Sequence, residues 1–281
     1  MVIIADSGSS KTNWIISDGK TENIKINTEG LNPNFTDVDT IRSVIANKVL
    51  PFTGDRTASK VFFYGSGCSD THLCKMVKEG IEGVFPDAHT EVNSDLLGAA
   101  RALLGNNSGI ACILGTGSNS GLYDGNRIIA NIPPLGFILG DEGSGSYLGK
   151  RLLSDYLKGV MPPDISNLFG SKYQTDKDRV IEKVYRGEFP NKYIAGFVVF
   201  LKDNIEKKYC RELIKEAFSD FISRNIKFYD GYDKLKISFT GSIAWHFREL
   251  LEEVMEVNGL YTGEILREPS EQIMQYHLKH Y

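Results

Sequence analysis

The sequence predicts an α/β protein built from two halves of similar design. In each half, an apolar strand, a turn of small polar residues and a second strand form a hairpin, near residue 2 and again near residue 110. Further strands then alternate with amphipathic helical segments, which is the pattern of an α/β domain. The 281 residues suffice for two domains of ordinary size. We therefore expect an internal structural duplication, although the halves share little sequence.

Composition and charge limit the classes of function. The chain is 41% hydrophobic and 24% charged, as is typical of a globular protein. A formal net charge of −4 argues against binding nucleic acid through a basic surface. We expect no secretory leader, and no apolar run approaches the roughly 20 residues of a membrane span. The four cysteines lack the spacing of a metal site, which indicates reduced thiols, so we expect a cytoplasmic protein that binds neither nucleic acid nor membranes.

The first hairpin carries unusual chemistry in its turn. Residues 2–5 and 13–17 are the apolar strands, and residues 6–12 between them read Asp-Ser-Gly-Ser-Ser-Lys-Thr. Glycine lets the backbone approach a ligand closely, and successive N–H groups in such a turn can bind an anion. Asp6, at the end of the first strand, is suited to a hydrated Mg²⁺ ion, which prefers oxygen ligands.

The rest of the first half is predicted from periodicity and turn residues. We expect a strand over 22–27, a loop over 30–35, a helix capped by Asp37 or Asp39, a strand over 61–64, a helix through 76–81 and a strand over 90–93. A helix over 96–104 follows Ser94 and Asp95. Either residue would serve as its N-cap. A carboxylate at this junction could instead act as a general base that accepts a hydroxyl proton.

The second half opens with strands at 110–114, 120–123 and 126–131, around a turn that reads Gly-Thr-Gly-Ser-Asn-Ser. Asp141 and Glu142 then stand between glycines, after an apolar run. A solvated turn is one explanation. A carboxylate at a helix entry, with glycines that admit a ligand, is also suited to binding neighbouring hydroxyls. We expect later helices at 147–157, 177–185, 194–207, 211–228, 243–257 and from 270, and strands at 236–239 and 261–265.

Five motifs in order resemble a known family. They are residues 6–12, 93–95, 114–119, 140–144 and the Thr-Gly-Ser run at 240–242. Their order and spacing are similar to those of N-acetylglucosamine kinases in the BadF/BadG/BcrA/BcrD ATPase family, within the sugar kinase/Hsp70/actin superfamily. The resemblance spans nearly the whole chain. It implies two ribonuclease H-like (actin-like ATPase) domains with a cleft between them. Residues 1–93 would form the first, with the helix of 270–281 as an optional addition, and residues 94–269 the second.

The resemblance also implies an activity and a set of site residues. The protein would be an ATP-dependent kinase, a homodimer, that phosphorylates the 6-hydroxyl of N-acetylglucosamine or N-acetylmuramic acid. Asp95 would be the catalytic base, and Asp6 would organise Mg²⁺. The residues that would bind ATP are Ser7, Gly8, Ser9, Ser10, Lys11, Thr12, Gly115, Thr116, Gly117, Gly241 and Ser242. Those that would contact the sugar are Asn34, Asp95, Ser118, Asn119, Leu135, Gly136 and Asp141.

Two departures from the family pattern stand out. Ser7, Ser9 and Ser10 replace glycines and a threonine of the first turn, and serine has less freedom at positive φ. Leu135 stands where the animal-type kinase has a tryptophan, which leaves the identity of the sugar open.

Other functions are weighed against this one. An ATPase that activates a radical dehydratase would need thiolates for an iron–sulfur cluster, and the cysteines do not have the placement expected of such activators. A non-catalytic nucleotide-binding module is disfavoured because the chain carries no added peptide-binding domain. The P-loop and dinucleotide-binding motifs are both incomplete, since each lacks one of its glycines.

Overall fold

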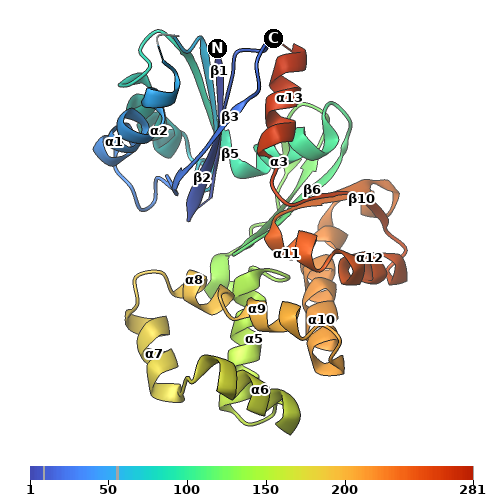
Figure 1. The fold of residues 1–281 in the computed structure, drawn as a ribbon. Helices are drawn as coiled ribbons and strands as arrows, with labels where there is room; N and C mark the ends of the chain where they lie inside the picture. The colour runs from blue at the N-terminus through green and yellow to red at the C-terminus, as the bar shows by residue number, and fades with distance from the viewer. Residues whose placement is uncertain (9, 55–56, 281) are drawn as a thin grey trace. The chain divides into compact units, whose positions relative to one another are not determined.

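A computed structural model describes residues 1–8, 10–54 and 57–280 (Figure 1). The chain divides into two compact units. The first comprises Met1–Asn107, Asp124–Ile128 and Glu268–Tyr281, and the second comprises Ser108–Tyr123 and Ile129–Arg267. Each unit is organised around a five-stranded mixed sheet. The predicted α/β class is therefore confirmed.

The first sheet has the strand order β3-β2-β1-β4-β5. Its strands are β1 (Val2–Ser7), β2 (Lys11–Ser17), β3 (Ile24–Glu29), β4 (Lys60–Gly65) and β5 (His89–Ser94). The first three are antiparallel neighbours, whereas β1, β4 and β5 run parallel. In register, Asp6 lies opposite Tyr64, and Tyr64 lies opposite Asn93. The carboxyl ends of these three strands thus meet at one edge of the sheet.

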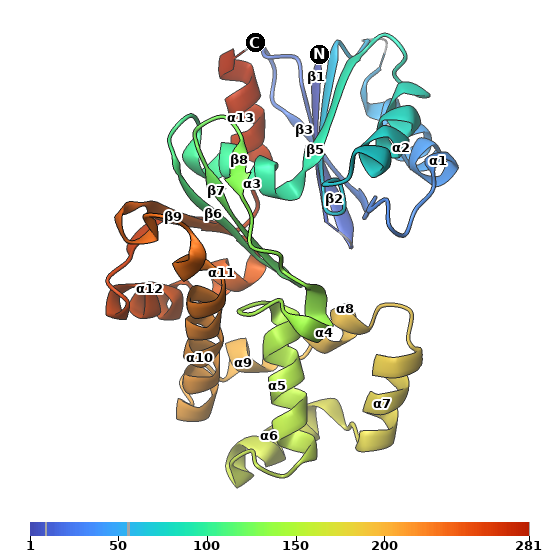
Figure 2. The ribbon, with the colours of Figure 1, turned by 180° about the vertical axis from the view of Figure 1, so that it is seen from behind.

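Helices cover both faces of this sheet, because its strands alternate apolar side chains between the faces. On one face, residues such as Ala5 and Phe63 pack against α1 (Val38–Lys48) and α2 (Thr71–Glu82). On the other face, residues such as Phe62 pack with α3 (Asp95–Leu104) and α13 (Ser270–His280) (Figures 1 and 2). A short 3₁₀ helix, Leu50–Phe52, follows α1.

The border of the first unit differs from the predicted boundary after residue 93. The helix α3 stays with the first sheet. Its Gly98 lies so close to the Tyr64 ring that an added Cβ would be 2.8 Å from Tyr64 Cγ. The predicted division after residue 93 falls within the motif of residues 93–95, whereas the packing of α3 keeps it with the first sheet. The C-terminal helix α13 also lies in the first unit.

The second sheet has the strand order β10-β9-β6-β7-β8. Its strands are β6 (Gly109–Leu114), β7 (Ser118–Tyr123), β8 (Ile128–Ala130), β9 (Lys236–Thr240) and β10 (Tyr261–Leu266). β6 pairs antiparallel with β7 and parallel with β9, and β9 pairs parallel with β10. Side chains such as Cys112 and Phe239 enter a large apolar core with the helices of this unit.

The helices of the second unit follow the predicted periodicity only in part. They are α4 (Gly136–Leu139), α5 (Gly145–Leu157), α6 (Pro163–Tyr173), α7 (Lys177–Arg186), α8 (Pro190–Ala195), α9 (Val198–Asp203), α10 (Lys208–Arg224), α11 (Ser242–His246) and α12 (Arg248–Val257), with 3₁₀ helices Ile226–Phe228 and Tyr232–Lys234. The predicted helix over 194–207 is interrupted near Gly196, and that over 243–257 is interrupted at Phe247. The prediction missed α6, which begins at Pro163, a favourable first helical residue. Among the described residues, no helix is long and apolar enough to span a membrane.

Candidate functional site

Two carboxylates lie at the carboxyl edge of the first sheet. Asp6 is the penultimate residue of β1, and Asp95 is the first residue of α3, directly after β5. Ser94 is the N-cap of α3, because its Oγ accepts a hydrogen bond from the Leu97 N–H at 3.2 Å. Asp95 Oδ1 instead accepts from the Leu96 N–H at 2.8 Å, which orients the carboxylate. The cap therefore does not depend on Asp95.

Burial changes the proton affinity of both carboxylates. It raises the pKa of Asp95 to about 6, although hydrogen bonds from backbone N–H groups oppose the shift. Burial likewise raises the pKa of Asp6 to about 6, and the negative charge of Asp95 acts in the same direction. Hydrogen bonds from Asn13 and Ser270 oppose that rise. A carboxyl group with a pKa near neutrality is suited to general-base chemistry.

The surroundings of Asp6 fit a hydrated magnesium ion. Its Oδ2 accepts a hydrogen bond from Ser270 Oγ at 3.2 Å, which fixes the carboxylate, and Asp95 adds negative charge nearby. The described residues contain no group of three or more His, Cys, Asp or Glu side chains that could hold a metal ion unaided. Mg²⁺ commonly takes one or two protein carboxylates and completes its shell with water and phosphate oxygens. An ion at Asp6 would have to be completed in that way.

Hydrogen bonds within the first hairpin stabilise its turn. Gly8 N–H donates to Lys11 O at 3.0 Å and closes the turn. Ser7 and Thr12 are fully buried, and their hydroxyl oxygens lie 2.8 Å apart. Ser7 Oγ also accepts from the Leu31 N–H at 3.1 Å. Their hydroxyls are thus engaged inside the hairpin, so the phosphate contacts predicted for Ser7 and Thr12 cannot involve these side chains in this conformation.

The exposed part of the first turn contains Gly8, Ser10 and Lys11. Lys11 Nζ forms an ion pair with Glu268 Oε1 at 2.5 Å, and both side chains are about half exposed. The predicted phosphate ligand Ser9 lies outside the described residues.

In the second unit, three segments converge on the second turn. The turn closes through a hydrogen bond from Gly115 N–H to Gly117 O at 2.9 Å. The first two amides of α5 hold it in place, since Gly145 donates to Gly115 O at 2.8 Å and Ser146 donates to Thr116 O at 2.9 Å. These two amides therefore support the turn and do not face a ligand.

The Thr-Gly-Ser run approaches the same turn. Gly241 has a φ of +116°, and a Cβ there would lie 2.4 Å from Leu114 O, so only glycine fits. Ser242, the other residue predicted here, begins α11. The adjacent Thr240 hydroxyl is buried and has no hydrogen-bond partner among the described residues. An unpaired buried hydroxyl is unfavourable by about 1–3 kcal/mol, so a bound ligand or water would relieve it.

Asp141 lies against this turn. Its Oδ1 accepts from the Ser118 N–H at 3.3 Å, and a Cβ on Gly117 would be 2.9 Å from its Oδ2. Burial raises the pKa of Asp141 to about 6. Asp141 and Leu135 have φ values of +56° and +60°, which are strained for residues with a side chain. Their loop also contains Gly136, and Leu135 is 62% exposed.

The two asparagines predicted to contact the sugar form hydrogen bonds with neighbouring groups. Asn119, on β7, accepts at Oδ1 from the Ser120 N–H and from Asn131 Nδ2, both at 2.9 Å. Asn34, in the first unit, donates from Nδ2 to Asn32 Oδ1 at 3.1 Å and is exposed.

The predicted site residues therefore form two groups, one in each unit. Asp6, Asp95, Asn34 and the first turn belong to the first unit, whereas the second turn, Asp141 and Gly241 belong to the second. Sequence reasoning missed Ser270, which contacts Asp6 from 264 residues away. No local motif could have indicated that contact.

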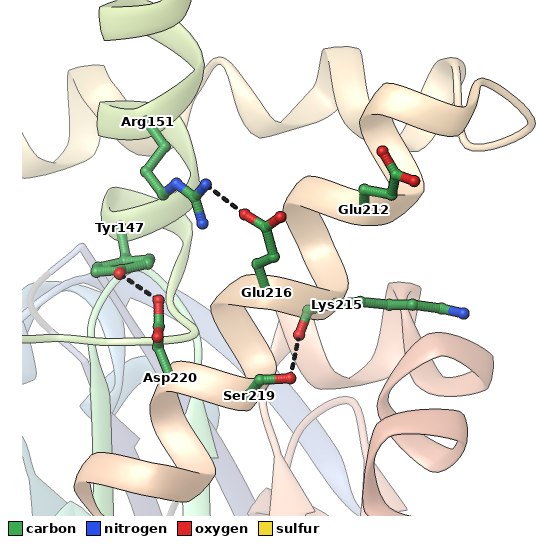
Figure 3. A pocket seen from close by; sticks show the side chains of 7 residues that line it. All are labelled: Tyr147, Arg151, Glu212, Lys215, Glu216, Ser219 and Asp220. Carbon is green, nitrogen blue, oxygen red and sulfur yellow. Dashed lines mark hydrogen bonds and ion pairs between the residues drawn. The ribbon is translucent and has the colours of Figure 1, made fainter. Parts of the chain in front are cut away.

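Figure 3 shows a hollow of the second unit that contains none of the predicted site residues. It lies between α5 and α10 and is lined by Tyr147, Arg151, Glu212, Lys215, Glu216, Ser219 and Asp220. Four of its polar side chains pair with one another, since Tyr147 Oη donates to Asp220 and Arg151 donates to Glu216, both at 2.6 Å. We assign no ligand to it.

Comparison with solved structures finds similarity over the whole chain. A protein from Porphyromonas gingivalis, provisionally named an N-acetylglucosamine kinase, is 41% identical with a TM-score of 0.94, and the match covers 99% of both chains. A protein with the same provisional name from Chromobacterium violaceum is 16% identical with a TM-score of 0.75, over 98% of both chains. A non-polymerising variant of MamK bound to AMPPNP is 11% identical with a TM-score of 0.51, over 99% of this chain and 97% of that one.

The last two similarities concern the fold alone, and they confirm the predicted actin-like class. No family model matches the chain, and no curated protein matches it in sequence.

Proposed function

The chain belongs to the family of the Porphyromonas gingivalis protein, with 41% identity over 99% of both chains, and from this membership we propose that it is a sugar kinase. More specifically, we propose that the chain is a member of the BadF/BadG/BcrA/BcrD family and that it transfers the γ-phosphoryl group of ATP to the 6-hydroxyl of an amino sugar. N-acetylglucosamine is the first candidate and N-acetylmuramic acid the second. The observation that carries the proposal is the pair of carboxylates, Asp6 and Asp95, at one edge of the first sheet.

Asp95 is the proposed base. With a pKa of about 6, it is ionised at neutral pH and can still accept a proton from a sugar hydroxyl as that oxygen attacks phosphorus. The hydrogen bond from Leu96 to Oδ1 fixes the direction of the group. Phosphoryl transfer depends mainly on positioning and on neutralising charge, so one oriented base is chemically sufficient.

Asp6 is the proposed magnesium ligand. When bound, Mg²⁺ neutralises charge on the phosphates of ATP. The role of the chain is to hold the Asp6 carboxylate in place through Ser270 and Asn13.

The two turns are the proposed phosphate sites. In the first unit, Gly8, Ser10 and Lys11 contact the phosphates of ATP. Lys11 leaves its ion pair with Glu268 and binds a phosphate oxygen instead. In the second unit, Gly115, Thr116 and Gly117 act through their backbone. Gly241 and Ser242 border the adenosine, and the unpaired Thr240 hydroxyl supports a ligand beside them.

The proposed sugar contacts divide between the units. They are Asn34 and Asp95 in the first, and Ser118, Asn119, Leu135, Gly136 and Asp141 in the second. Asp141 is supported most strongly, because it is buried beside the glycine turn and one of its oxygens is already oriented by the Ser118 amide. The homodimer and the cytoplasmic location stay predictions.

The structure lends no support to an iron–sulfur activator. Cys68, Cys112 and Cys210 are buried, and burial raises the pKa of each thiol. A thiol that stays protonated is a poor cluster ligand.

A coupled ADP-release assay with Mg²⁺-ATP tests the proposal. The panel contains N-acetylglucosamine, N-acetylmuramic acid, N-acetylmannosamine, glucosamine, glucose and a control without sugar. We expect ADP release that depends on an N-acetylated amino sugar. ADP release that is equal with and without every sugar would contradict a sugar kinase and favour an ATPase that acts on a protein partner.

A further inference from the structure

The C-terminal helix α13 delivers a hydroxyl group to Asp6. Ser270, its first residue, is only 5% exposed, and its Oγ donates to Asp6 Oδ2 at 3.2 Å. A serine hydroxyl has one proton to donate, and a carboxylate can only accept. This contact therefore has a defined direction, and it fixes one carboxylate oxygen of Asp6.

The face of α13 that carries Ser270 is buried along the length of the helix. Ser270, Ile273, Met274 and His277 are all buried, and their spacing of three, four and seven residues places them on one side of a helix. Ile273 and Met274 pack with apolar side chains of the first sheet. About 10 Å of helix separates Ser270 from His277, at 1.5 Å per residue. A helix packed in this way holds its first residue at a fixed position.

A polar cluster anchors the far end of the helix. His277 stacks on Phe62 with a ring-centroid distance of 3.6 Å, and its Nε2 lies 2.7 Å from Tyr64 Oη. Arg101 donates to the same Tyr64 oxygen at 2.5 Å. Because a guanidinium group only donates, the phenol proton of Tyr64 is free to be donated to His277. The cluster joins α13 to β4 and α3.

Ion pairs connect the segment at the start of the helix to β2 and β3. Glu268 pairs with Lys11, and Glu271 pairs with Lys25. These pairs are exposed and therefore weak individually. Together with the buried face of α13, these ion pairs keep Ser270 beside Asp6.

We propose that Ser270 is a positioning residue for Asp6, and that α13 exists in part to present it. The hydroxyl holds the Asp6 carboxylate in the orientation that receives a divalent cation bound to a nucleoside diphosphate or triphosphate. This inference rests on the proposed function, in which Asp6 is the magnesium ligand. Hydrogen bonds that orient a metal-binding carboxylate typically change metal affinity or activity by about 10- to 100-fold when they are removed.

The test compares ADP binding with and without Mg²⁺ by titration calorimetry on the full chain. Ser270→Ala removes the hydroxyl, Ser270→Thr keeps it, and Ser17→Ala is the matched control. Ser17 is also buried, at 3% exposed, and accepts a hydrogen bond from the Gly19 N–H, but it pairs with Val2 at the other end of the hairpin. If Ser270→Ala unfolds, Ser270→Cys keeps the volume of the side chain with only a weak donor.

We expect Ser270→Ala to reduce the gain in ADP affinity that Mg²⁺ provides by about tenfold or more, while metal-free ADP binding is unchanged. Ser270→Thr should restore most of the gain, and Ser17→Ala should not alter it. A wild-type Mg²⁺ effect that survives in Ser270→Ala would overturn the inference alone, as would a Ser270→Thr variant as impaired as Ser270→Ala. A wild-type protein whose ADP binding does not respond to Mg²⁺ would contradict the proposed function itself.

Discussion

The substitution Asp95→Asn separates a catalytic base from a structural carboxylate, because the two roles predict opposite changes in stability. The pKa of Asp95 is raised by burial from 3.8 to about 6, a difference of about two units. At 1.36 kcal/mol per unit, keeping this group ionised at pH 8 destabilises the folded state by up to about 3 kcal/mol. Asparagine carries no charge and keeps an oxygen for the Leu96 N–H. We therefore expect the ligand-free variant to be more stable than wild type by about 1–2 kcal/mol at pH 8, since asparagine still requires some desolvation.

The pH dependence has a definite sign. The folded state holds the Asp95 proton up to about pH 6, whereas the unfolded chain releases it near pH 4. The penalty of the ionised carboxylate therefore appears as the pH rises from about 4 to 6, and the advantage of Asp95→Asn should grow over that range and then level off. Thermal unfolding of both proteins, followed by circular dichroism at pH 4–8, measures this difference in stability. The same variant should lose about 10²- to 10⁴-fold in turnover if Asp95 is the base.

Asp37→Asn is the matched control for this experiment. Asp37 caps α1 by accepting from the Thr40 N–H at 2.8 Å, and hydrogen bonding to the Thr40 hydroxyl and then to this N–H lowers its pKa. Neutralising it should reduce stability at neutral pH and leave turnover unchanged. If Asp95 only supported the start of α3, Asp95→Asn would behave like Asp37→Asn. That result would refute the assignment of the base.

Three further predictions follow from the site. The kcat/KM of the wild type should rise with pH through about 6 and then level off, as Asp95 loses its proton; a profile that is flat across this range would contradict the base. Gly241→Ala should weaken ADP binding and lower the melting temperature, because its methyl group would meet Leu114 O at 2.4 Å, whereas Gly259→Ala, at a φ of +67° with open space around it, should leave ADP binding intact. Asp141→Asn should raise the KM for the sugar, measured by kinetics, more than it changes ADP affinity, measured by calorimetry. An equal effect on both would contradict the assignment of Asp141 to the sugar site.

Much of the fold follows from local patterns in the sequence. The two hairpins were predictable because each depends on neighbouring residues. The cap of α1 was predicted as Asp37 or Asp39 for the same reason, and the structure assigns it to Asp37. The junction of β5 with α3 was predicted too, although only the structure assigns the cap to Ser94 and leaves Asp95 free of that role.

The missing features depend on packing between distant segments. Ser270 reaches Asp6 across nearly the whole chain. The burial of Ser7 and Thr12 depends on the register of the hairpin, which the residue types of the turn do not determine. The interruption near Gly196 was missed because apolar residues continue on both sides of it and preserve a helical pattern.

Transfer of radiolabelled phosphate from [γ-³²P]ATP to N-acetylglucosamine tests the central claim most directly, with the position of the phosphate determined by NMR. We predict labelled sugar 6-phosphate from the wild type, and a loss of label transfer in Asp95→Asn while ADP binding persists. Labelled inorganic phosphate without any labelled sugar, across the whole panel, would contradict the account.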